Sequence, residues 1–475
     1  MNKLKDRVEL LNLVKVRYKY FGAFIIVAIF YFALNLVLAP KAHATTYNLK
    51  PDSTFNPAAD CNIYDAIEAI NTKSDVNFCP AGESGSNSIV LEAGTYTLSN
   101  AGGSFVGNLP TITSDADLSV IGAGPSTTIV NGNGFTGIKI ANDRNYSVSN
   151  LTLESFENNA TDGTLFQYGG NLTVNSIIVR NNNCAYFSET EANPTCVLFA
   201  NFGGFETTLT ISNSSFYNNT AFYLVGVTSL SGEDFVGMDV EANIFNNTFS
   251  NNNSAIFAVI NSASLETNVV MNFYNNTVAD NNNNGLPFMF SLGWVNGAFP
   301  TYGSELNMRN NIFSNNFGYD SESDSLIPTS CPSAEFIVSP STVTSNGGNI
   351  ISDSTCTGML NQASDKNNTN PLLDPYVIVN GTGVRPLQAG SPAIGSAVSG
   401  TPTTPNTDQR GLARPQGANS DSGAYELQSS GPTPNNNANS LANTGSNTGI
   451  PAIVAGILVL AGSIVSGYSL LKRYH

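Results

Sequence analysis

A short phrase of polar and apolar residues recurs through the middle of this chain. Each copy has an Asn, a small polar residue, one large apolar residue and then more Asn. The copies read NSSFYNN at 213–219, NNTFSNN at 246–252, NNTVADN at 275–281 and NNIFSNN at 310–316, with looser forms at 150–159 and 175–181. The central apolar residue returns every 29 to 38 residues, at Ile178, Phe216, Phe249, Val278 and Phe313. A period of this length predicts a solenoid of stacked repeats.

The apolar bursts indicate which kind of solenoid it is. They are two to five residues long or alternate with polar residues, which suits short strands and is too short for helices. Asn at both ends of each burst suits a sharp corner, because Asn tolerates left-handed backbone and bonds locally. Where coils stack about 4.8 Å apart, equivalent Asn side chains can form an amide ladder along the axis. An Asn-rich disordered linker would lack the regular Phe, Ile and Val. The pattern therefore predicts an all-β fold, a parallel β-helix.

The segment before the first repeats carries a different pattern. Ile63, Ile67 and Ile70 share one face of a helix within CNIYDAIEAINTKSDVNFC at 61–79, followed by NSIVLEAGTYTLSN at 87–100. This stretch resembles the CSLREAI domain found at the start of many bacterial surface β-helices. We expect the helix to cap the solenoid, since an open end exposes unpaired strand edges.

Two further stretches resemble known families. DLSVIGAGPSTTIVNGNG at 117–134 is similar to the first coils of pectin-lyase-like proteins, which implies a right-handed β-helix. GSPAIGSAV at 390–398, TDQRGLARPQG at 407–417 and DSGAYEL at 421–427 resemble the choice-of-anchor Q domain, which implies display on a cell surface. In that segment we expect Arg410 and Arg414 to form a salt bridge with Asp408, Asp421 or Glu426 that locks the final coil.

The net charge of the chain limits the classes of molecule that it can bind. Charged residues make up 11% of the chain, and residues 45–440 hold 10 basic and 33 acidic residues, a net charge of −23. Such a surface is repelled by nucleic acid and by anionic lipid. Calcium and neutral or basic glycans remain compatible with it, so we expect no nucleic-acid partner.

The N-terminus resembles an export signal. Six Lys or Arg precede the apolar run Phe21–Leu38, and Ala42-His43-Ala44 follows as an A-x-A cleavage pattern. We predict a signal peptide over 1–44 that is cleaved after Ala44. An uncleaved N-terminal membrane anchor is the alternative, and both versions export the rest of the chain.

The C-terminus carries a second apolar span. Its 22 residues, Ile450–Leu471, are enough to cross a bilayer as a helix, and the basic tail 472–475 places that end in the cytoplasm. LANTG at 441–445, in the linker 429–449, resembles an LAxTG sortase signal, which implies cleavage between Thr444 and Gly445 and attachment to the cell envelope. A plain membrane anchor is the alternative. Both place the protein on the cell surface.

Cysteine usage agrees with export. Six Cys fall as three neighbouring pairs, and an even count in an oxidising compartment predicts disulfides. Fifteen connectivities are possible, of which we favour the sequential one, because each bond would then close a local loop. The favoured pairs are Cys61 with Cys79, Cys184 with Cys196, and Cys331 with Cys356.

Histidine limits the chemistry. The chain has only His43 and His475, and processing at both ends would remove both, which excludes a Ser-His-Asp triad, a Cys-His pair and a His-ligated metal site.

Two clusters of charged residues are weak candidates for chemistry that needs no His. Lys139, Asp143 and Arg144 could act in catalysis, although a solvated turn is the simpler interpretation.

The second charge cluster is acidic. Asp320, Glu322 and Asp324 alternate in YDSESDS and could bind calcium, although an ordinary acidic loop would look the same. We predict no other cofactor.

One aromatic stretch interrupts the repeat, NGLPFMFSLGWVNGAFPTYG at 284–303. Insertions between coils often form a binding rim, and aromatic side chains with Asn, Ser and Thr between them can hold sugars. Burial against the solenoid is the competing explanation. The predicted ligand-facing residues are Phe288, Phe290, Trp294, Phe299 and Tyr302.

The sequence thus predicts an N-terminal cap with first strands over 45–116, β-helix coils over 117–375 and a closing region over 376–428. The expected function is adhesion, or binding of glycans or of another cell's surface, without catalysis. There are two alternatives: a polysaccharide lyase or glycoside hydrolase, and a passive stalk. A hydrolase would need two carboxylates roughly 5 to 10 Å apart.

Overall fold

The chain folds as a parallel β-helix. The computed structural model describes residues 44–98, 109–140, 144–157, 166–168, 170–184, 197–203, 207–230, 239–262, 268–283, 289–292, 303–320, 322–333, 336–401 and 403–428. All of these belong to one compact unit that ends at Gln428. Within these ranges no helix is both long and apolar enough to cross a bilayer. The predicted signal before Ala44, the sorting motif with Thr444 and Gly445, and the span 450–471 lie outside the described residues.

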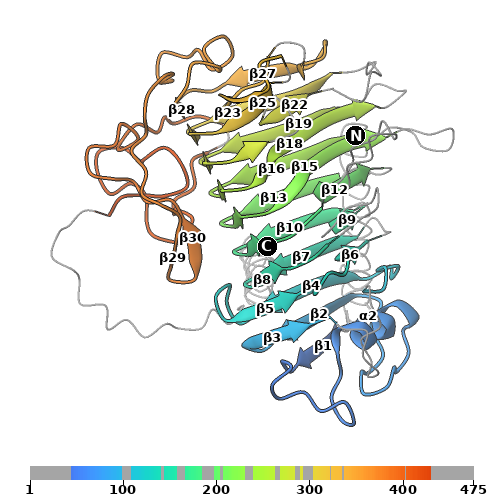
Figure 1. The fold of residues 1–475 in the computed structure, drawn as a ribbon. Coiled ribbons are helices and arrows are strands. Elements are labelled where there is room, and N and C mark those ends of the chain that lie inside the picture. Colours follow the sequence, from blue (N-terminus) through green and yellow to red (C-terminus); the bar gives the residue numbers. More distant parts are fainter. Residues whose placement is uncertain are drawn as a thin grey trace, which may run out of the picture. The chain divides into compact units, whose positions relative to one another are not determined.

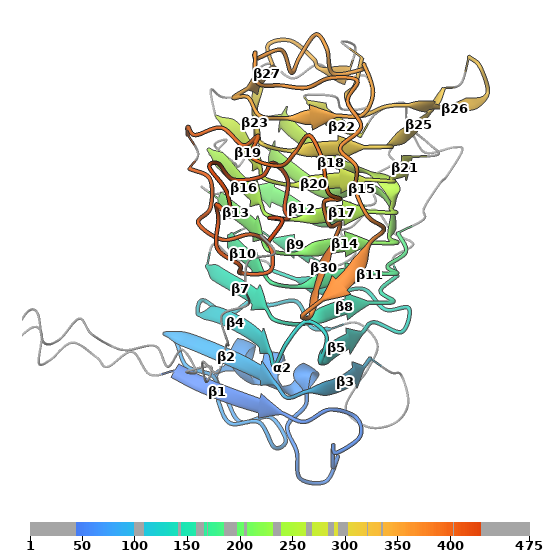
Figure 2. The same ribbon diagram turned by 90° about the vertical axis from the view of Figure 1, so that its left-hand side faces the viewer.

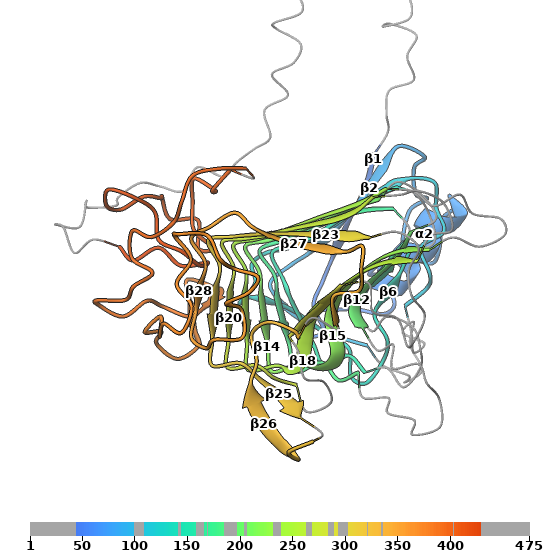
Figure 3. The same ribbon diagram turned by 90° about the horizontal axis from the view of Figure 1, so that it is seen from above.

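Three parallel sheets form the walls of the solenoid (Figures 1 and 3). The 10-stranded sheet runs in the order β1 (Ala44–Leu49), β2 (Ser86–Leu91), β4 (Asp117–Gly122), β7 (Asn145–Ser149), β10 (Asn171–Asn175), β13 (Thr207–Ser212), β16 (Val240–Phe245), β19 (Val269–Tyr274), β23 (Ser304–Arg309) and β27 (Thr342–Ser345). Its side chains alternate between core and outside, as the period of two requires.

The second wall is a 9-stranded sheet of short strands. These are β28 (Ile350–Ile351), β24 (Ile312–Ser314), β20 (Thr277–Ala279), β17 (Thr248–Ser250), β14 (Ser215–Tyr217), β11 (Ile178–Arg180), β8 (Thr152–Glu154), β5 (Thr128–Asn131) and β3 (Gly94–Thr97). The third wall is a 6-stranded sheet of β22 (Phe290–Leu292), β18 (Asn253–Ser262), β15 (Thr220–Leu230), β12 (Val197–Gly203), β9 (Phe166–Tyr168) and β6 (Ile138–Lys139). Seen from above, the coils turn counter-clockwise as they rise, which is the right-handed sense (Figure 3).

The recurring phrase builds two corners and the short strand between them. In the copy at 246–252, Asn246 and Asn251 have φ of 54° and 58°, in the left-handed region that Asn tolerates. Asn247 and Asn252 follow them and are buried. Phe249 points into the core between the two corners, where its ring stacks on Phe216 at a centroid distance of 4.8 Å.

The predicted amide ladder is present at both corners. One row joins Asn182, Asn219, Asn252, Asn281 and Asn316 through side-chain hydrogen bonds of 2.9 to 3.0 Å. The other joins Asn247, Asn276, Asn311 and Asn349 at 3.0 to 3.4 Å. Each amide also forms a hydrogen bond with the backbone of a neighbouring coil. The rows therefore supply partners for buried polar groups that would otherwise lack a hydrogen bond at a tight corner.

One copy of the phrase was aligned one residue out of register. Val179, and not Ile178, pairs with Phe216 and occupies the central core position. Ile178 pairs instead with Ser215, on the outward side of the same strand. The looser sequence NSIIVRN offers three consecutive apolar residues, and the alternation of the strand alone decides which of them faces inward.

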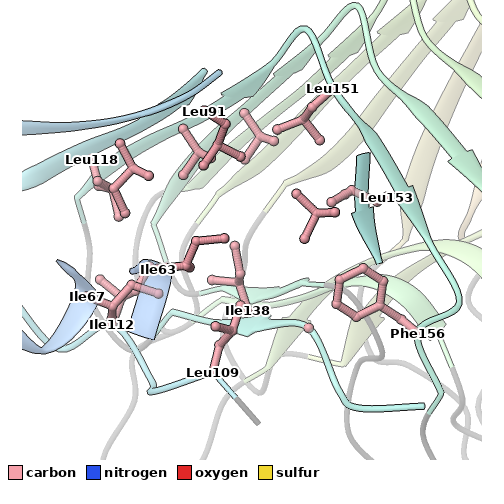
Figure 4. A pocket seen from close by; sticks show the side chains of 15 residues that line it. Ile63, Ile67, Leu91, Leu109, Ile112, Leu118, Ile138, Leu151, Leu153 and Phe156 are labelled. Carbon is pink, nitrogen blue, oxygen red and sulfur yellow. The ribbon is translucent and has the colours of Figure 1, made fainter. Parts of the chain in front are cut away.

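The N-terminal end of the solenoid is filled by the predicted helix. Helix α2 (Ile63–Thr72) buries Ile63, Ile67 and Ile70 in the same core cluster as the first strands. Its N-cap is Asn62, whose side chain accepts from the Asp65 backbone N–H at 2.9 Å. Beside the helix lies an apolar cavity of about 30 Å³ (Figure 4). Such a void is too small and too apolar to attract a polar ligand.

Disulfides close loops at both ends of the stack. Cys61 bonds Cys79 beside α2, and Cys331 bonds Cys356 beside the last coil. These two bonds confirm the sequential pairing. Cys184 is also disulfide-bonded, and its predicted partner Cys196 lies outside the described residues. Beyond the last strands, Cys356 and Leu360 are fully buried, so the loop at 352–366 covers this end of the core.

The predicted closing region does not close the end of the solenoid. Residues 370–428, here called the strap, run back along the outer side of the 9-stranded sheet (Figures 2 and 3). The strap has little regular structure apart from the hairpin of β29 (Val377–Val379) and β30 (Thr382–Val384). A further hairpin, formed by β25 (Phe317–Asp320) and β26 (Ser325–Pro328), pairs with β21 (Asn282–Asn283) and projects from the wall.

Candidate functional site

The strap is held to the outer face of the 9-stranded sheet largely by polar contacts. Gln409 donates to the Ser214 carbonyl at 3.0 Å and accepts from the Thr248 hydroxyl at 2.6 Å. The Asn310 amide donates to the Val398 carbonyl at 3.0 Å. A small apolar cluster of Ile312, Ile350, Leu387 and Ala393 adds to these contacts. Coils that are far apart in the stack therefore all contact the same segment, the strap.

One aromatic contact ties the strap to the middle of the stack. Tyr376 stacks on Tyr217 at a centroid distance of 4.1 Å, and its hydroxyl lies 3.1 Å from the Ser215 hydroxyl. Burial raises the pKa of Tyr376 above its usual value. The phenol therefore stays neutral at ordinary pH and keeps both the stacking and the hydrogen bond.

A polar groove with a cavity volume of about 800 Å³ lies between the upper coils and the strap. This volume is within the range of ligand sites. Amide and hydroxyl side chains dominate its walls, and Phe317, Pro328 and Leu373 supply the apolar part. The amide and hydroxyl residues include Asn315, Asn316, Ser352, Ser354, Asn368 and Asn370.

An ion pair between the solenoid and the strap forms one wall of the groove. Asp280 accepts from the Arg385 guanidinium and, at 2.9 Å, from the Asn315 amide. Arg385 directly follows β30 and is 8% exposed. Its Nη1 also donates to the Ser250 hydroxyl at 3.2 Å, while its Nε has no hydrogen-bond partner in the part of the chain that the structure describes. The pair fixes the strap beside the corner of the coil.

Sequence reasoning missed both members of this pair. Asp280 is the acidic member of the corner row, with a φ of 56°, where the copies of the phrase at 213–219, 246–252 and 310–316 have Asn. An acidic residue at a corner position that is otherwise Asn was the sequence feature that could have indicated a contact there. Arg385 lies in a stretch without a repeat, so nothing in the sequence indicated which coil it would contact.

The second carboxylate of the groove is also engaged. Asp353 accepts from the Ser330 hydroxyl at 2.6 Å and from the Thr355 backbone N–H at 2.9 Å. Two carboxylates and one guanidinium thus converge, but each carboxylate already accepts at least two hydrogen bonds. The groove is better equipped to bond hydroxyl groups of a ligand than to remove a proton from one.

The predicted basic candidates lie elsewhere. Lys139 is half-buried at the end of β6 in the 6-stranded sheet. Arg144 is exposed and precedes β7 of the 10-stranded sheet. Asp143 lies outside the described residues. Neither Lys139 nor Arg144 lines the polar groove.

The acidic candidates form the turn between β25 and β26. Asp320 accepts from the Glu322 backbone N–H at 3.0 Å and from the Ser323 hydroxyl at 2.6 Å, and the latter bond chiefly lowers its pKa. Asp324 accepts from the Tyr319 hydroxyl at 2.6 Å. In the described part of the chain, no three Asp, Glu, His or Cys side chains are grouped to hold a metal ion. The carboxylates of Asp320 and Asp324 thus accept hydrogen bonds from within the turn itself.

The aromatic stretch at 284–303 is described in part. Phe290 is fully buried in β22, where its ring stacks on Phe257 at 5.2 Å. Its prediction as a ligand-facing residue was wrong, because the strand alternation turns it into the core. Phe288, Trp294, Phe299 and Tyr302 lie outside the described residues.

The two arginines of the closing motif form salt bridges, as predicted. Arg410 pairs with Asp408 at 2.6 Å, and Arg414 pairs with Glu426 at 3.3 Å. Both pairs are buried and lie within the strap, since all four residues belong to 408–426. They hold the loops of the strap together and do not lock the final coil, because the strap packs beside the stack rather than at its end.

Comparison with known proteins finds only distant structural likenesses. No family model matches the chain, and no curated protein matches it. Among solved structures it is similar to pectate lyase Pel9A, with 15% identity over 80% of this chain and 96% of that one and a TM-score of 0.31. It is also similar to the A-module of the Azotobacter vinelandii mannuronan C-5 epimerase AlgE4, with 14% identity, 61% and 83% coverage and a TM-score of 0.26.

A third similar structure is a mannuronic acid specific polysaccharide family 6 lyase from human gut microbiota. It has 10% identity, covers 66% of this chain and 88% of its own, and has a TM-score of 0.23. At these identities and TM-scores, the three likenesses imply nothing about the chemistry of this chain.

Proposed function

We propose that this chain is an exported, surface-attached β-helix that binds a neutral glycan in the polar groove, without catalysis. The observation that carries the proposal is the composition of the groove. Amide and hydroxyl side chains surround a cavity of about 800 Å³, and its charged groups already bond to protein partners. Such a lining can exchange hydrogen bonds with sugar hydroxyls, and Phe317 offers an apolar face for a ring.

Charge favours an uncharged ligand over a polyanion. Residues 45–440 have a net charge of −23, and the groove contributes Asp280 and Asp353 against one Arg385. A uronate polymer would meet repulsion from the whole surface and find no uncommitted cation in this lining. A neutral glycan avoids that cost.

Two observations support export and surface attachment. Strand β1 begins at Ala44, the residue at which the predicted signal peptide ends, so cleavage there would leave the fold intact. The disulfides at both ends of the stack suit an oxidising compartment. We propose that the LANTG motif, with Thr444 and Gly445, attaches the chain to the envelope through a sortase.

A polysaccharide panel tests the binding function. Residues 45–440 would be incubated with neutral, amino and uronate polysaccharides, and both retention and release of unsaturated or reducing ends would be followed. We expect retention on a neutral polymer with no new ends. Release of ends would overturn the proposal in favour of a lyase or hydrolase, and no retention on any polymer would favour a passive stalk.

Two variants test whether the glycan binds in the polar groove. Ser354→Ala combined with Asn368→Gly removes a hydroxyl and an amide from the groove, and Gly accepts the φ of 50° at position 368. We expect about tenfold weaker retention. Asn380→Gly is the matched control, because Asn380 has a φ of 52° but lies in the β29–β30 turn, outside the groove lining. Equal effects of the two variants would contradict binding in the groove.

A further inference from the structure

One buried arginine of the solenoid lacks the counter-ion that the others have. Arg309 is 0% exposed, and within the described ranges none of its three guanidinium nitrogens has a hydrogen-bond partner. The other two buried arginines of the described chain each pair with a carboxylate, Arg385 with Asp280 and Arg414 with Glu426. A guanidinium stays protonated in proteins, and a buried charge without a partner is strongly unfavourable. The environment of Arg309 therefore requires an anion.

The groups around Arg309 supply no negative charge. Its aligned neighbour on the preceding coil is Tyr274, whose ring stacks on Phe245 at 5.0 Å. Of the titratable groups that the structure describes, only the Tyr274 phenol interacts electrostatically with Arg309. Burial raises the pKa of Tyr274 to about 12, so this phenol is neutral at ordinary pH. The charge of Arg309 is thus not balanced by the described side chains.

A second buried side chain next to Arg309 also lacks partners. The Asn275 backbone N–H donates to the Arg309 carbonyl at 3.0 Å, so the two residues are neighbours on successive coils. The Asn275 side chain is 0% exposed, and in the described part of the chain neither its nitrogen nor its oxygen has a hydrogen-bond partner. A buried amide normally uses both groups. Two adjacent residues therefore present unused donors and one unused acceptor.

The strap covers both side chains. The corner residues on either side of Asn275 turn to the strap, since Asn246 donates to the Thr407 carbonyl at 2.9 Å and Asn310 donates to the Val398 carbonyl at 3.0 Å. Between these contacts the strap backbone passes over the guanidinium, and a Cβ at position 400 would lie 2.9 Å from its Nη1. Gly400 is the residue that permits this close approach.

The unused groups specify the chemistry of a ligand. It must carry a negative charge and several acceptor oxygens for the guanidinium, and it must keep a hydrogen to donate to the Asn275 oxygen. An oxyanion that retains a proton meets these requirements, and its oxygens match the fork of the guanidinium. Chloride and acetate have no hydrogen to donate. Because both side chains are fully buried, the ligand must also be small, and a polymer is excluded.

We propose that Arg309 and Asn275 bind a small, hydrogen-bearing oxyanion of the bicarbonate or hydrogenphosphate type beneath the strap. Neither residue lines the polar groove, so this site does not depend on glycan binding. The anion joins the upper coils to the strap, and it stabilises the folded chain because the site exists only when the strap is in place.

Equilibrium dialysis tests the site directly. The full-length chain, purified in detergent and degassed buffer, would be dialysed against radiolabelled bicarbonate or radiolabelled inorganic phosphate. We expect one of these anions to bind at one equivalent per chain, and about a tenfold excess of acetate or chloride to leave it bound. Displacement by acetate or chloride would contradict the need for a proton on the anion. Binding of neither labelled anion would mean that water alone surrounds the guanidinium. Either result overturns the proposal.

Two substitutions assign the bound anion to these residues. Arg309→Met removes the charge at similar volume, and Asn275→Gly removes the amide while accepting the corner φ of 54°. We expect binding to be weaker by about tenfold or more for Arg309→Met, with a smaller loss for Asn275→Gly. Arg180→Met and Asn181→Gly are the matched controls, because Arg180 pairs with Glu154 and Asn181 is an exposed corner residue with a φ of 56°. Unchanged binding to Arg309→Met would contradict the site.

Urea unfolding gives a second readout and shows that the variants are folded. In buffer free of both anions we expect Arg309→Met to have the higher urea midpoint, because the unaltered chain then buries an unpaired charge. Saturating bicarbonate or phosphate should raise the midpoint of the unaltered chain, so that the difference between the two chains shrinks or reverses. An equal rise in both chains would reveal a general salt effect and overturn the proposal.

Discussion

Single residues that depart from the repeated pattern form contacts between the solenoid and the strap. Asp280 stands in a row of corner Asn residues and holds Arg385 of the strap. Arg309 follows Phe245 and Tyr274 in the outward register of the 10-stranded sheet, where a large polar residue would normally face water. Here the strap passes over that position near Gly400, and Arg309 is 0% exposed.

Burial without a partner makes Arg309 a weak point. Among the described residues none of its three guanidinium nitrogens has a hydrogen-bond partner, and desolvation lowers its pKa. An unpaired buried charge costs more than an apolar side chain of similar volume. We expect Arg309→Met to raise the free energy of unfolding of residues 45–440 by about 1 to 3 kcal/mol, measured by urea denaturation.

Arg180→Met is the control for that substitution. Arg180 pairs with Glu154 at 2.8 Å, and the two side chains are 29% and 17% exposed. Its loss should cost about 1 kcal/mol or less, because solvent screens the pair. A drop in stability for Arg309→Met would show that the guanidinium has a favourable partner in solution.

At the scale of one coil, the corner Asn rows are the main polar element of the core. The side-chain amide of Asn252 takes part in four hydrogen bonds, since it donates to the Phe216 carbonyl and to Asn281 and accepts from the backbone and side-chain nitrogens of Asn219. Removal of this amide leaves buried donors and acceptors in three coils without partners.

We therefore expect Asn252→Ala to lower the free energy of unfolding by about 3 kcal/mol or more. Asn243→Ala removes a half-buried amide from the outer face of the 10-stranded sheet, near water, and should change stability by about 0.5 kcal/mol. Urea unfolding of both variants gives the comparison. Similar losses would mean that the corner rows contribute no more than surface ladders do.

At the scale of the whole molecule, the strap changes how the solenoid holds together. In a simple solenoid each coil contacts only its neighbours. Here one segment contacts Ser214 and Thr248 through Gln409, and the carbonyl of Gly348, several coils further along, through Ser422. The strap thus couples coils that do not touch one another, and we expect it to make unfolding more cooperative.

Loosening the strap should reduce that cooperativity. Asp280→Asn restores the common corner residue but leaves the Arg385 guanidinium without its anion. We expect it to lower the urea m-value and to expose the strap to limited proteolysis, with a coupling energy to Arg385→Met of about 2 kcal/mol in a double-mutant cycle. The Arg180–Glu154 pair supplies the reference cycle, with coupling of about 0.5 kcal/mol. An unchanged m-value with an intact strap would contradict this role.

The repeat, the corners and the capping helix were predictable because each follows from near neighbours. A left-handed corner requires Asn or Gly whatever lies elsewhere in the chain, and stacking of equivalent coils then aligns the amides. Even so, Ile178 was placed one residue out of register, because three apolar residues in a row leave the inward side undecided until the strand pairs with Phe216 of the next coil.

The polar groove could not be predicted in the same way. It joins Asp280, Asp353 and Arg385, which are separated by many residues and meet only because the strap turns back along the stack. The burial of Phe290 was likewise decided by strand pairing, as its residue type suits both a core and a rim.

The sequence alone determined the coil, its Asn corners and the helix at its start, since backbone sterics and hydrogen-bond satisfaction act within a few residues and repeat with every turn. Only the tertiary structure decided where the strap lies and which carboxylates meet which arginine. Those features depend on contacts between segments far apart in the chain, and no local preference specifies them.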